Sequence, residues 1–371
     1  MKITCAFPGG NVVVERMEGD HVWLHQDLRD TSTDWFYWYF RITGAEGKEI
    51  HFHFTQSPAL GARGPAFSRD RGATWNWLGD TDPASFTFRF GPCDMDVLFS
   101  MTIPYLEADW TRFVAGLDND PEVKTGILCH SAQGRTVETL KFGNTVSAKY
   151  RVLLTCRHHA CETMASYALE GWIAFVLSRE PEALWLRSNV EFLAIPFVDK
   201  DGCEAGDQGK NRRPHDHNRD YGDGLYPETV ALRSQGVAWQ PHVALDLHCP
   251  WLRSWLNESV YLVGTDRPEM WQEQMRYSAI LEKVRRGPLP FRAADNLPFG
   301  QDWNTAENYN SKISCTRWAL SLPGMRLATT VEIPYASAGG VEVNQDTARR
   351  LGADLALACA GYLQTLEQMP D

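Results

Sequence analysis

Alternation of apolar and polar residues distinguishes the first third of the chain from the rest. Ile50–Phe54 (IHFHF) and Phe86–Phe90 (FTFRF) alternate with the period of a half-buried strand. Trp35–Thr43 (WFYWYFRIT) is aromatic on both faces, which predicts a central strand of a packed sandwich. Turn-rich segments separate these runs, and no long amphipathic helix pattern precedes about residue 108. We therefore predict a small antiparallel β-sandwich domain over residues 1–115.

Strand-like and helix-like runs alternate after Trp110. Short apolar runs occupy residues 151–156, 190–198, 242–248, 259–264 and 328–335. Small and apolar residues recur at helical spacing over 162–178 and 344–368. Such strands suit the buried centre of a mixed sheet. This pattern predicts an α/β domain over residues 116–371, a mixed β-sheet flanked by helices on both faces.

Composition narrows the class of protein. With 371 residues, 43% of them hydrophobic, the chain can form a large core and more than one domain. A net charge of -11 disfavours nucleic acid as a partner. The nine irregularly spaced cysteines favour a reducing compartment, and we see no signal segment or membrane-spanning run. We expect a soluble cytoplasmic protein without a membrane partner, whose oligomeric state the sequence does not reveal.

Four residues that could form a metal site follow or end the predicted strands. His159 and Glu162 have the spacing H-x-x-E between a strand and a helix, a weak signal alone because such histidines are often caps. His248 ends another apolar strand, at the edge where open α/β sheets bind ligands. Glu332 lies inside an apolar run, where a carboxylate is costly unless it is paired or functional. Two histidines, one glutamate ligand and a spare glutamate are typical of zinc hydrolases.

The loop Gly209–Tyr221 (GKNRRPHDHNRDY) is rich in basic and amide side chains. A solvated basic loop is the simpler interpretation of such a run. Its position between the ligand-bearing strands instead favours a site that binds a carboxylate or an oxyanion, because a guanidinium group matches a carboxylate with two hydrogen bonds.

Together these motifs resemble the zinc metallocarboxypeptidases, and specifically the cytosolic carboxypeptidase branch, in which an aromatic β-sandwich precedes the catalytic domain. The motifs that carry the resemblance are RHHACE, FVDKDG, DHNRDY, DLH and TTVEIPY. The resemblance implies a peptide or protein C-terminus as substrate and one zinc ion per chain. The implied roles are zinc ligands for His159, Glu162 and His248, orientation of His159 for Asp216, binding of the terminal carboxylate for Asn218 and Arg219, and general base for Glu332.

Three further roles that the resemblance implies align less cleanly. An arginine upstream of the Asn218–Arg219 pair would polarise the scissile carbonyl; we choose Arg212, and the loop leaves Lys210 and Arg213 open. Tyr309 would be the mobile tyrosine of the family. Arg317 would face the terminal side chain and select glutamate or aspartate, unless it only pairs with a surface carboxylate.

Other histidines, the cysteines and the aromatic run have plainer explanations than a functional role. His51 and His53 share one strand face, but no third metal donor is evident near them, so we interpret them as surface residues. His158 would pair only with Cys161, a poor zinc site, and the cysteines near the ligands suit small buried hydrophobes. The aromatic run at Trp35 is interpreted as core packing and not as a carbohydrate platform.

Two competing functions stay open. A zinc deacylase or amidohydrolase on the same fold would cleave an N-acyl amino acid or a cell-wall peptide. Alternatively, the sandwich is a protein- or glycan-binding module with an accessory catalytic half. The full set of ligands together with Glu332 argues against an inactive enzyme.

Overall fold

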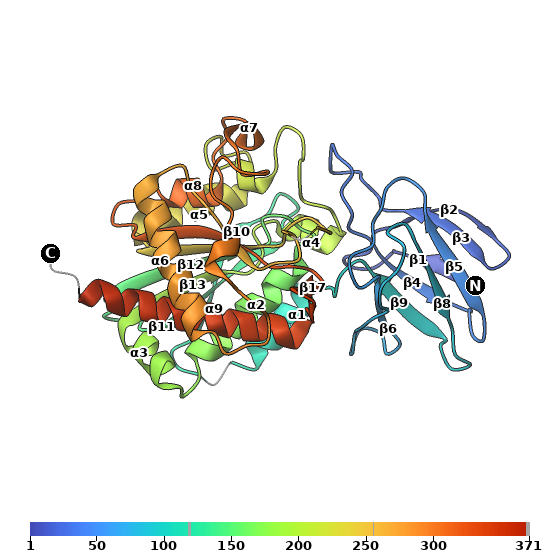
Figure 1. Ribbon diagram of the computed structural model, residues 1–371, viewed down its shortest axis with the longest axis horizontal. Coiled ribbons are helices and arrows are strands. Elements are labelled where there is room, and N and C mark those ends of the chain that lie inside the picture. Colours follow the sequence, from blue (N-terminus) through green and yellow to red (C-terminus); the bar gives the residue numbers. More distant parts are fainter. Residues whose placement is uncertain (118–119, 255, 369–371) are drawn as a thin grey trace.

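A computed structural model describes residues 1–117, 120–254 and 256–368. Figure 1 shows an N-terminal β body beside a larger α/β body. Among the described residues, no helix is both long and apolar enough to cross a membrane. One hydrophobic cluster runs from Val12 in the β body to Leu363 near the end of the chain, so the two bodies share a core.

The β body is a sandwich of two sheets, as predicted. Its strands are β1 (Lys2–Thr4), β2 (Val13–Glu18), β3 (His21–His25), β4 (Tyr39–Thr43), β5 (Glu49–Phe54), β6 (Ala66–Ser68), β7 (Asn76–Trp77), β8 (Ser85–Arg89) and β9 (Asp96–Ser100). The sheet orders are β1-β4-β9-β6-β7 and β2-β3-β5-β8. All pairs are antiparallel except β3–β5, which is parallel. The strands predicted from IHFHF and FTFRF are confirmed as β5 and β8.

Aromatic rings fill the space between the two sheets. Phe52 stacks on Phe86 at 4.5 Å, and Phe99 meets Phe88 edge-on at 4.8 Å. Each fully buried ring of this kind contributes about 1.5–3 kcal/mol by leaving water. The prediction of one strand over Trp35–Thr43 is wrong at its start, because β4 begins only at Tyr39. Trp35 and Phe36 instead contact Trp251 of the α/β body, whereas Trp38 packs on sandwich rings.

The α/β body is built on a mixed sheet of seven strands. They are β10 (Lys124–His130), β11 (Thr136–Gly143), β12 (Tyr150–Cys156), β13 (Val190–Ile195), β14 (Val243–His248), β15 (Tyr261–Val263) and β16 (Leu327–Glu332), in the order β10-β11-β13-β12-β14-β16-β15. β13, β12, β14 and β16 are parallel, and the pairs β10–β11, β11–β13 and β15–β16 are antiparallel. A short hairpin, β17 (Ser337–Ala338) and β18 (Val341–Glu342), follows β16.

Helices cover both faces of this sheet, which confirms the predicted architecture (Figure 1). The helices are α1 (Glu107–Ala115), α2 (Thr163–Val176), α3 (Pro181–Asn189), α4 (Lys200–Ala205), η1 (His217–Arg219), α5 (Pro227–Trp239), α6 (Pro268–Val284), η2 (Ala293–Asp295), α7 (Ala306–Tyr309), α8 (Cys315–Ala319) and α9 (Gln345–Glu367). α2, α3, α6 and α9 pack on one face, and α5 and α8 pack on the other. α2 and α9 touch backbone to backbone: a Cβ added at Gly171 would lie 1.8 Å from the Arg349 carbonyl oxygen. Glycine there lets α9 hold α2, and therefore the start of α2, in place.

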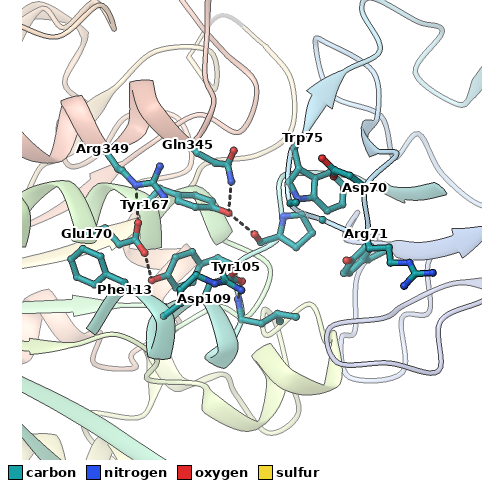
Figure 2. A pocket seen from close by; sticks show the side chains of 16 residues that line it. Asp70, Arg71, Trp75, Tyr105, Asp109, Phe113, Tyr167, Glu170, Gln345 and Arg349 are labelled. Carbon is teal, nitrogen blue, oxygen red and sulfur yellow. Dashed lines mark hydrogen bonds and ion pairs between the residues drawn. The ribbon is translucent and has the colours of Figure 1, made fainter. Parts of the chain in front are cut away.

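A cavity of about 680 Å³ lies at the seam between the two bodies. Figure 2 shows Asp70, Arg71 and Trp75 on the sandwich side and Tyr105, Tyr167, Glu170 and Arg349 on the other side. The buried Glu170 accepts hydrogen bonds from Tyr105 Oη at 2.7 Å and from Arg349 Nε at 2.8 Å. Because Arg349 belongs to α9 and Glu170 to α2, this pair adds a polar link to the contact of the two helices.

Candidate active site

The candidate site lies where three parallel strands end. His159 and Glu162 follow β12, His248 is the last residue of β14, and Glu332 is the last residue of β16. His248 and Glu332 are paired in the sheet register. The chain passes from β12 to β13 on one side and later returns to β14 on the other side of β12, so the strand order reverses there. Open α/β sheets bind their ligands at such a reversal.

His159, Glu162 and His248 form a buried cluster at this edge. Glu162 Oε1 lies 2.7 Å from His159 Nδ1, and Glu162 Oε2 lies 2.7 Å from His248 Nδ1. The two Nδ1 atoms are 3.1 Å apart, and ligand atoms of all three side chains fall within 4.8 Å of one another. Two imidazoles and one carboxylate are a ligand set of catalytic zinc sites, which leave one position for water.

The far nitrogens of both imidazoles lie near carboxylates. His248 Nε2 is 2.7 Å from Asp246 Oδ2, and His159 Nε2 is 3.7 Å from Asp216 Oδ1. Such a partner fixes the ring and leaves the near nitrogen free to bind metal. Burial alone would raise the pKa of Glu162, but the charges of His159 and His248 lower it to about 2, so this carboxylate is ionised. The donor set therefore fits a zinc ion.

Asp246 also connects the cluster to a second buried histidine. Asp246 Oδ1 lies 2.8 Å from His158 Nδ1 and accepts a hydrogen bond from Thr155 Oγ1 at 2.8 Å. His158 Nε2 lies 2.7 Å from Tyr221 Oη. Sequence reasoning set His158 aside and gave Asp246 no role. The signal that could have found Asp246 is the spacing D-x-H in one strand, since residues two apart face the same side.

Glu332 lies with the cluster in a cavity of about 390 Å³. It is buried, and its Oε2 atom has no hydrogen-bond partner within the described part of the chain. Burial raises the pKa of Glu332 to about 8. A buried carboxylate with a free oxygen has the chemistry of a general base. The cavity is also lined by Trp35, Cys249, Trp251, Asn257, Asp302, Trp303 and Asn308.

Trp35 brings the sandwich into the wall of this cavity. Its Nε1 atom donates to Cys161 Sγ at 3.2 Å, and its ring meets Trp251 edge-on at 4.6 Å. The aromatic run that sequence reasoning assigned wholly to the sandwich core therefore also forms part of the cavity wall.

The structure places Arg212 among three carboxylates and not at the cavity wall. Its guanidinium nitrogens lie 3.1 Å from Asp30 Oδ2, 2.6 Å from Asp199 Oδ2 and 2.9 Å from Asp207 Oδ2. Burial acts to lower the pKa of Arg212, but Asp199 and Asp30 hold it above its usual value. Asp30 lies in the β body, so Arg212 links the basic loop to that body.

Lys210, which sequence reasoning left as an alternative to Arg212, lines the cavity. Its Nζ atom lies 3.3 Å from His159 Nε2. Burial lowers the pKa of Lys210, and Arg219 adds to that effect. Arg213 is exposed and is absent from the cavity wall.

Asn218 contacts the cluster and Arg219 contacts a residue of the cavity wall, although neither side chain itself lines the cavity. Asn218 Nδ2 is 3.3 Å from His248 Nε2, and its Oδ1 accepts from the Cys315 backbone at 2.9 Å. Arg219 donates from Nη1 to the Asn218 carbonyl at 2.9 Å and from Nη2 to the Asn308 carbonyl at 3.4 Å. Asn308 lines the cavity, so the guanidinium group lies at its margin.

Tyr309 lies between two guanidinium groups. Its ring centroid is 4.8 Å from Arg219 Cζ and 4.3 Å from Arg317 Cζ, and its hydroxyl donates to Asn304 Oδ1 at 3.1 Å. Arg317 Nη2 is 2.9 Å from Asp266 Oδ2. Arg317 therefore has the carboxylate partner that the plainer interpretation expected. It also lines, with Tyr309, a pocket of only about 20 Å³.

Comparison with known proteins agrees with this geometry. The family model described as zinc carboxypeptidase (Peptidase_M14) matches residues 112–248, which include all three clustered side chains. Residues 112–248 of the chain are therefore similar to a zinc carboxypeptidase domain. Its curated relatives include cytosolic carboxypeptidase 3 of Bos taurus, 24% identical over 63% of this chain and 27% of that protein. Cytosolic carboxypeptidase 2 of Homo sapiens is 30% identical over 37% of this chain and 16% of that protein.

The chain spans only about a quarter of the length of the cytosolic carboxypeptidase 3 sequences that it matches. Solved structures share the whole fold. A metallo-carboxypeptidase from Burkholderia cenocepacia has a TM-score of 0.83 at 21% identity, covering 98% of this chain and 99% of that one. A metallo-carboxypeptidase from Pseudomonas aeruginosa, in complex with (2-guanidinoethylmercapto)succinic acid, has a TM-score of 0.80 at 20% identity, covering 99% and 100%. The order of sandwich and α/β body is therefore common to these proteins.

Proposed function

We propose that the chain is a zinc-dependent carboxypeptidase that hydrolyses the C-terminal peptide bond of peptides or proteins. The observation that carries the proposal is the convergence of His159, Glu162 and His248 within 4.8 Å, in the cavity that also contains Glu332. Asn218 and Arg219 at the margin supply the amide and guanidinium groups that a terminal carboxylate requires.

His159, Glu162 and His248 would hold one zinc ion per chain, with Asp216 and Asp246 orienting the two histidines. When bound, zinc acts as a Lewis acid that polarises a carbonyl group and lowers the pKa of water. Glu332 takes the proton of the attacking water through its free Oε2 atom. It then returns that proton to the amine that leaves when the peptide bond breaks.

Two cationic groups take different parts of the substrate in this proposal. Arg219 and Asn218 bind the terminal carboxylate, and Tyr309 closes over it from its place beside Arg219. Lys210, and not Arg212, faces the scissile carbonyl, because Lys210 lines the cavity whereas Arg212 is held by three carboxylates. A donor that meets an oxyanion in a site with little water contributes about 10²–10³ in kcat.

We propose that Arg317 gives a preference for C-terminal glutamate or aspartate. Support comes from the position of Arg317, whose guanidinium group lies at the same Tyr309 ring as the guanidinium group of Arg219. The ion pair of Arg317 with Asp266 is an argument against an acidic preference, because Asp266 would have to share or release the guanidinium group when a substrate carboxylate binds. The Pseudomonas aeruginosa protein was solved with a ligand that carries a guanidino group. A preference for basic residues, met by Asp266, is therefore the second candidate.

A panel of peptides that differ only in the last residue tests both statements. Mass spectrometry would follow the zinc-loaded chain, with Glu332→Gln as the inactive variant and Glu46→Gln, an exposed glutamate of the sandwich, as its matched control. We expect loss of one terminal glutamate or aspartate with the wild type and with Glu46→Gln, and no product with Glu332→Gln.

The other outcomes separate the parts of the proposal. Release of a basic residue would support the carboxypeptidase activity, and it would replace the preference for acidic residues by a preference for basic residues that pair with Asp266. Release of an apolar residue would remove any role of Arg317 in selection. No cleavage by a chain that binds zinc would favour the deacylase or amidohydrolase on the same fold.

We also propose that the protein works in the cytoplasm. All nine cysteines are free, as a reducing compartment requires, and the named relatives include cytosolic carboxypeptidases. Fractionation of the source cells with an antibody against the chain tests this, and recovery outside the cytoplasmic fraction would contradict it.

A further inference from the structure

The outer sheet of the sandwich gathers three histidines that have no part in the proposed reaction. His21 belongs to β3, and His51 and His53 belong to β5, which pairs with β3 in parallel. The register sets His21 opposite His51, while His51 and His53 are two residues apart and share a face. Sequence reasoning found no third metal donor for the H-x-H pair. The pairing of β3 with β5 supplies His21, and Asp20 precedes it in the turn.

The side chains are close enough to share one ion. Ligand atoms of Asp20, His21 and His51 lie within 4.8 Å of one another. The rings of His21 and His51 are stacked with centroids 4.7 Å apart, and Asp20 Oδ1 lies 3.6 Å from His21 Nε2. The side chains of His21 and Asp20 are 43% and 61% exposed, so an ion can reach them from solvent.

In His21 and His51, the Nε2 atom would bind the metal, and the other ring nitrogen, Nδ1, already contacts another group. His21 Nδ1 lies 2.9 Å from His53 Nε2, and His51 Nδ1 lies 2.8 Å from Thr87 Oγ1. When each Nδ1 carries the proton of such a contact, both Nε2 atoms present lone pairs. His53 thus serves to orient His21.

A hollow lies beside His51 and His53, although Asp20 and His21 are not among its lining residues. It has a volume of about 260 Å³ and is lined by His51, His53, Asp82, Ser85 and Thr87 among others. Figure 1 places β3 and β5 on the side of the sandwich that faces away from the α/β body. An ion bound there would be remote from the candidate active site.

We propose that Asp20, His21 and His51 form a second metal site, which takes a divalent transition-metal ion such as Zn²⁺. Two imidazoles and a carboxylate suit Zn²⁺, Ni²⁺ and Cu²⁺, and they do not suit Mg²⁺ or Ca²⁺. The ion would join β3 to β5, the one parallel pair of the sandwich. The site is independent of the reaction proposed above, because none of its residues touches that cavity.

Zinc binding to the full-length chain tests the site. The metal-free protein would be titrated with Zn²⁺ alone against an indicator dye. We expect about two ions per chain, the second bound more weakly because its ligands are exposed. His51→Gln should bind about one ion, and His130→Gln, an exposed histidine of β10, should still bind about two.

A second pair of measurements separates this site from the catalytic one. His248→Gln should lose the catalytic ion and keep the sandwich ion, and the double variant His51→Gln/His248→Gln should bind neither. Cu²⁺ added to His248→Gln should give a spectrum of electron paramagnetic resonance with nitrogen coupling, which His51→Gln removes. A wild type that binds a single ion, or a count that His51→Gln leaves unchanged, would overturn the proposal.

Discussion

Asp246→Asn is the substitution whose effect follows most directly from the contacts of the site. The change keeps the shape of the side chain and removes the charge that lies 2.7 Å from His248 Nε2 and 2.8 Å from His158 Nδ1. Burial would raise the pKa of Asp246, but His158 and His248 hold it far below its usual range, so the native group is a carboxylate. An amide in its place orients His248 less firmly and makes its Nδ1 atom a weaker ligand.

The expected loss of zinc affinity follows from the effect of carboxylates that hydrogen-bond to metal-binding histidines. Loss of a carboxylate behind a zinc histidine weakens metal binding about 10- to 100-fold, or about 1.4–2.7 kcal/mol. The metal-free chain should lose less than the about 3–5 kcal/mol seen when one partner of a buried ion pair is removed, because both imidazoles can release their proton. Most of the effect should therefore appear in zinc affinity.

The assay is competition for Zn²⁺ between the chain and a chromophoric chelator. Asp80→Asn, an exposed aspartate of the sandwich, serves as the matched control and should bind zinc like the wild type. Saturating zinc should restore turnover to Asp246→Asn in large part, since Glu332 is untouched. Unchanged zinc affinity in Asp246→Asn would refute the reasoning, whether or not turnover falls.

Other substitutions give sharp contrasts. Lys210→Met should lower kcat about 10²–10³-fold with little change in unfolding free energy. Arg212→Met should instead lower the unfolding free energy by about 3–5 kcal/mol, because it leaves buried carboxylates unpaired. Urea unfolding and initial rates would distinguish the two variants, and the reverse result would return the catalytic role to Arg212. Asp266→Asn should strengthen the preference for acidic C-terminal residues if Arg317 selects them. Faster cleavage of peptides with basic C-terminal residues would contradict that role of Arg317. Burial, with repulsion from Asp30, raises the pKa of Asp207 from 3.8 to about 6, so the folded chain holds this proton more tightly than the unfolded chain. The contribution of Asp207 to stability is therefore present at low pH and is lost as the pH rises through that interval; Asp207→Asn should flatten that part of the stability profile, and an unchanged slope would rule the group out. Trp35→Ala should raise KM for peptides, because it removes the cavity wall that the sandwich supplies, and unchanged KM would confine Trp35 to a structural role.

The parts of the site that sequence predicted are those attached to regular strands. His248 and Glu332 end buried strands of clear apolar pattern, and parallel strands bring such ends to one edge of a sheet. His159 and Glu162 follow the same logic, because they come directly after β12. These positions depend on the apolar pattern of each strand and on the rule that parallel strands end at one edge of the sheet.

The parts that sequence reasoning missed depend on long-range contacts. Arg212 is held away from the cavity by carboxylates that include Asp30, which is 182 residues away in the β body. The segment before Tyr39 carries a strand-like sequence but extends to the cavity, where Trp35 packs on Trp251. His21 reaches His51 only because β3 and β5 pair in parallel, a pairing that the alternation in each strand does not encode.

Hydrolysis of a matched pair of peptides tests the central claim most directly. The two peptides share one sequence ending in glutamate, and one has a free terminal carboxylate whereas the other has a terminal amide. The account predicts that the zinc-loaded chain releases glutamate from the free acid and leaves the amide intact, because Asn218 and Arg219 need the carboxylate. Equal cleavage of both peptides, or cleavage of neither by the zinc-loaded chain, would contradict it.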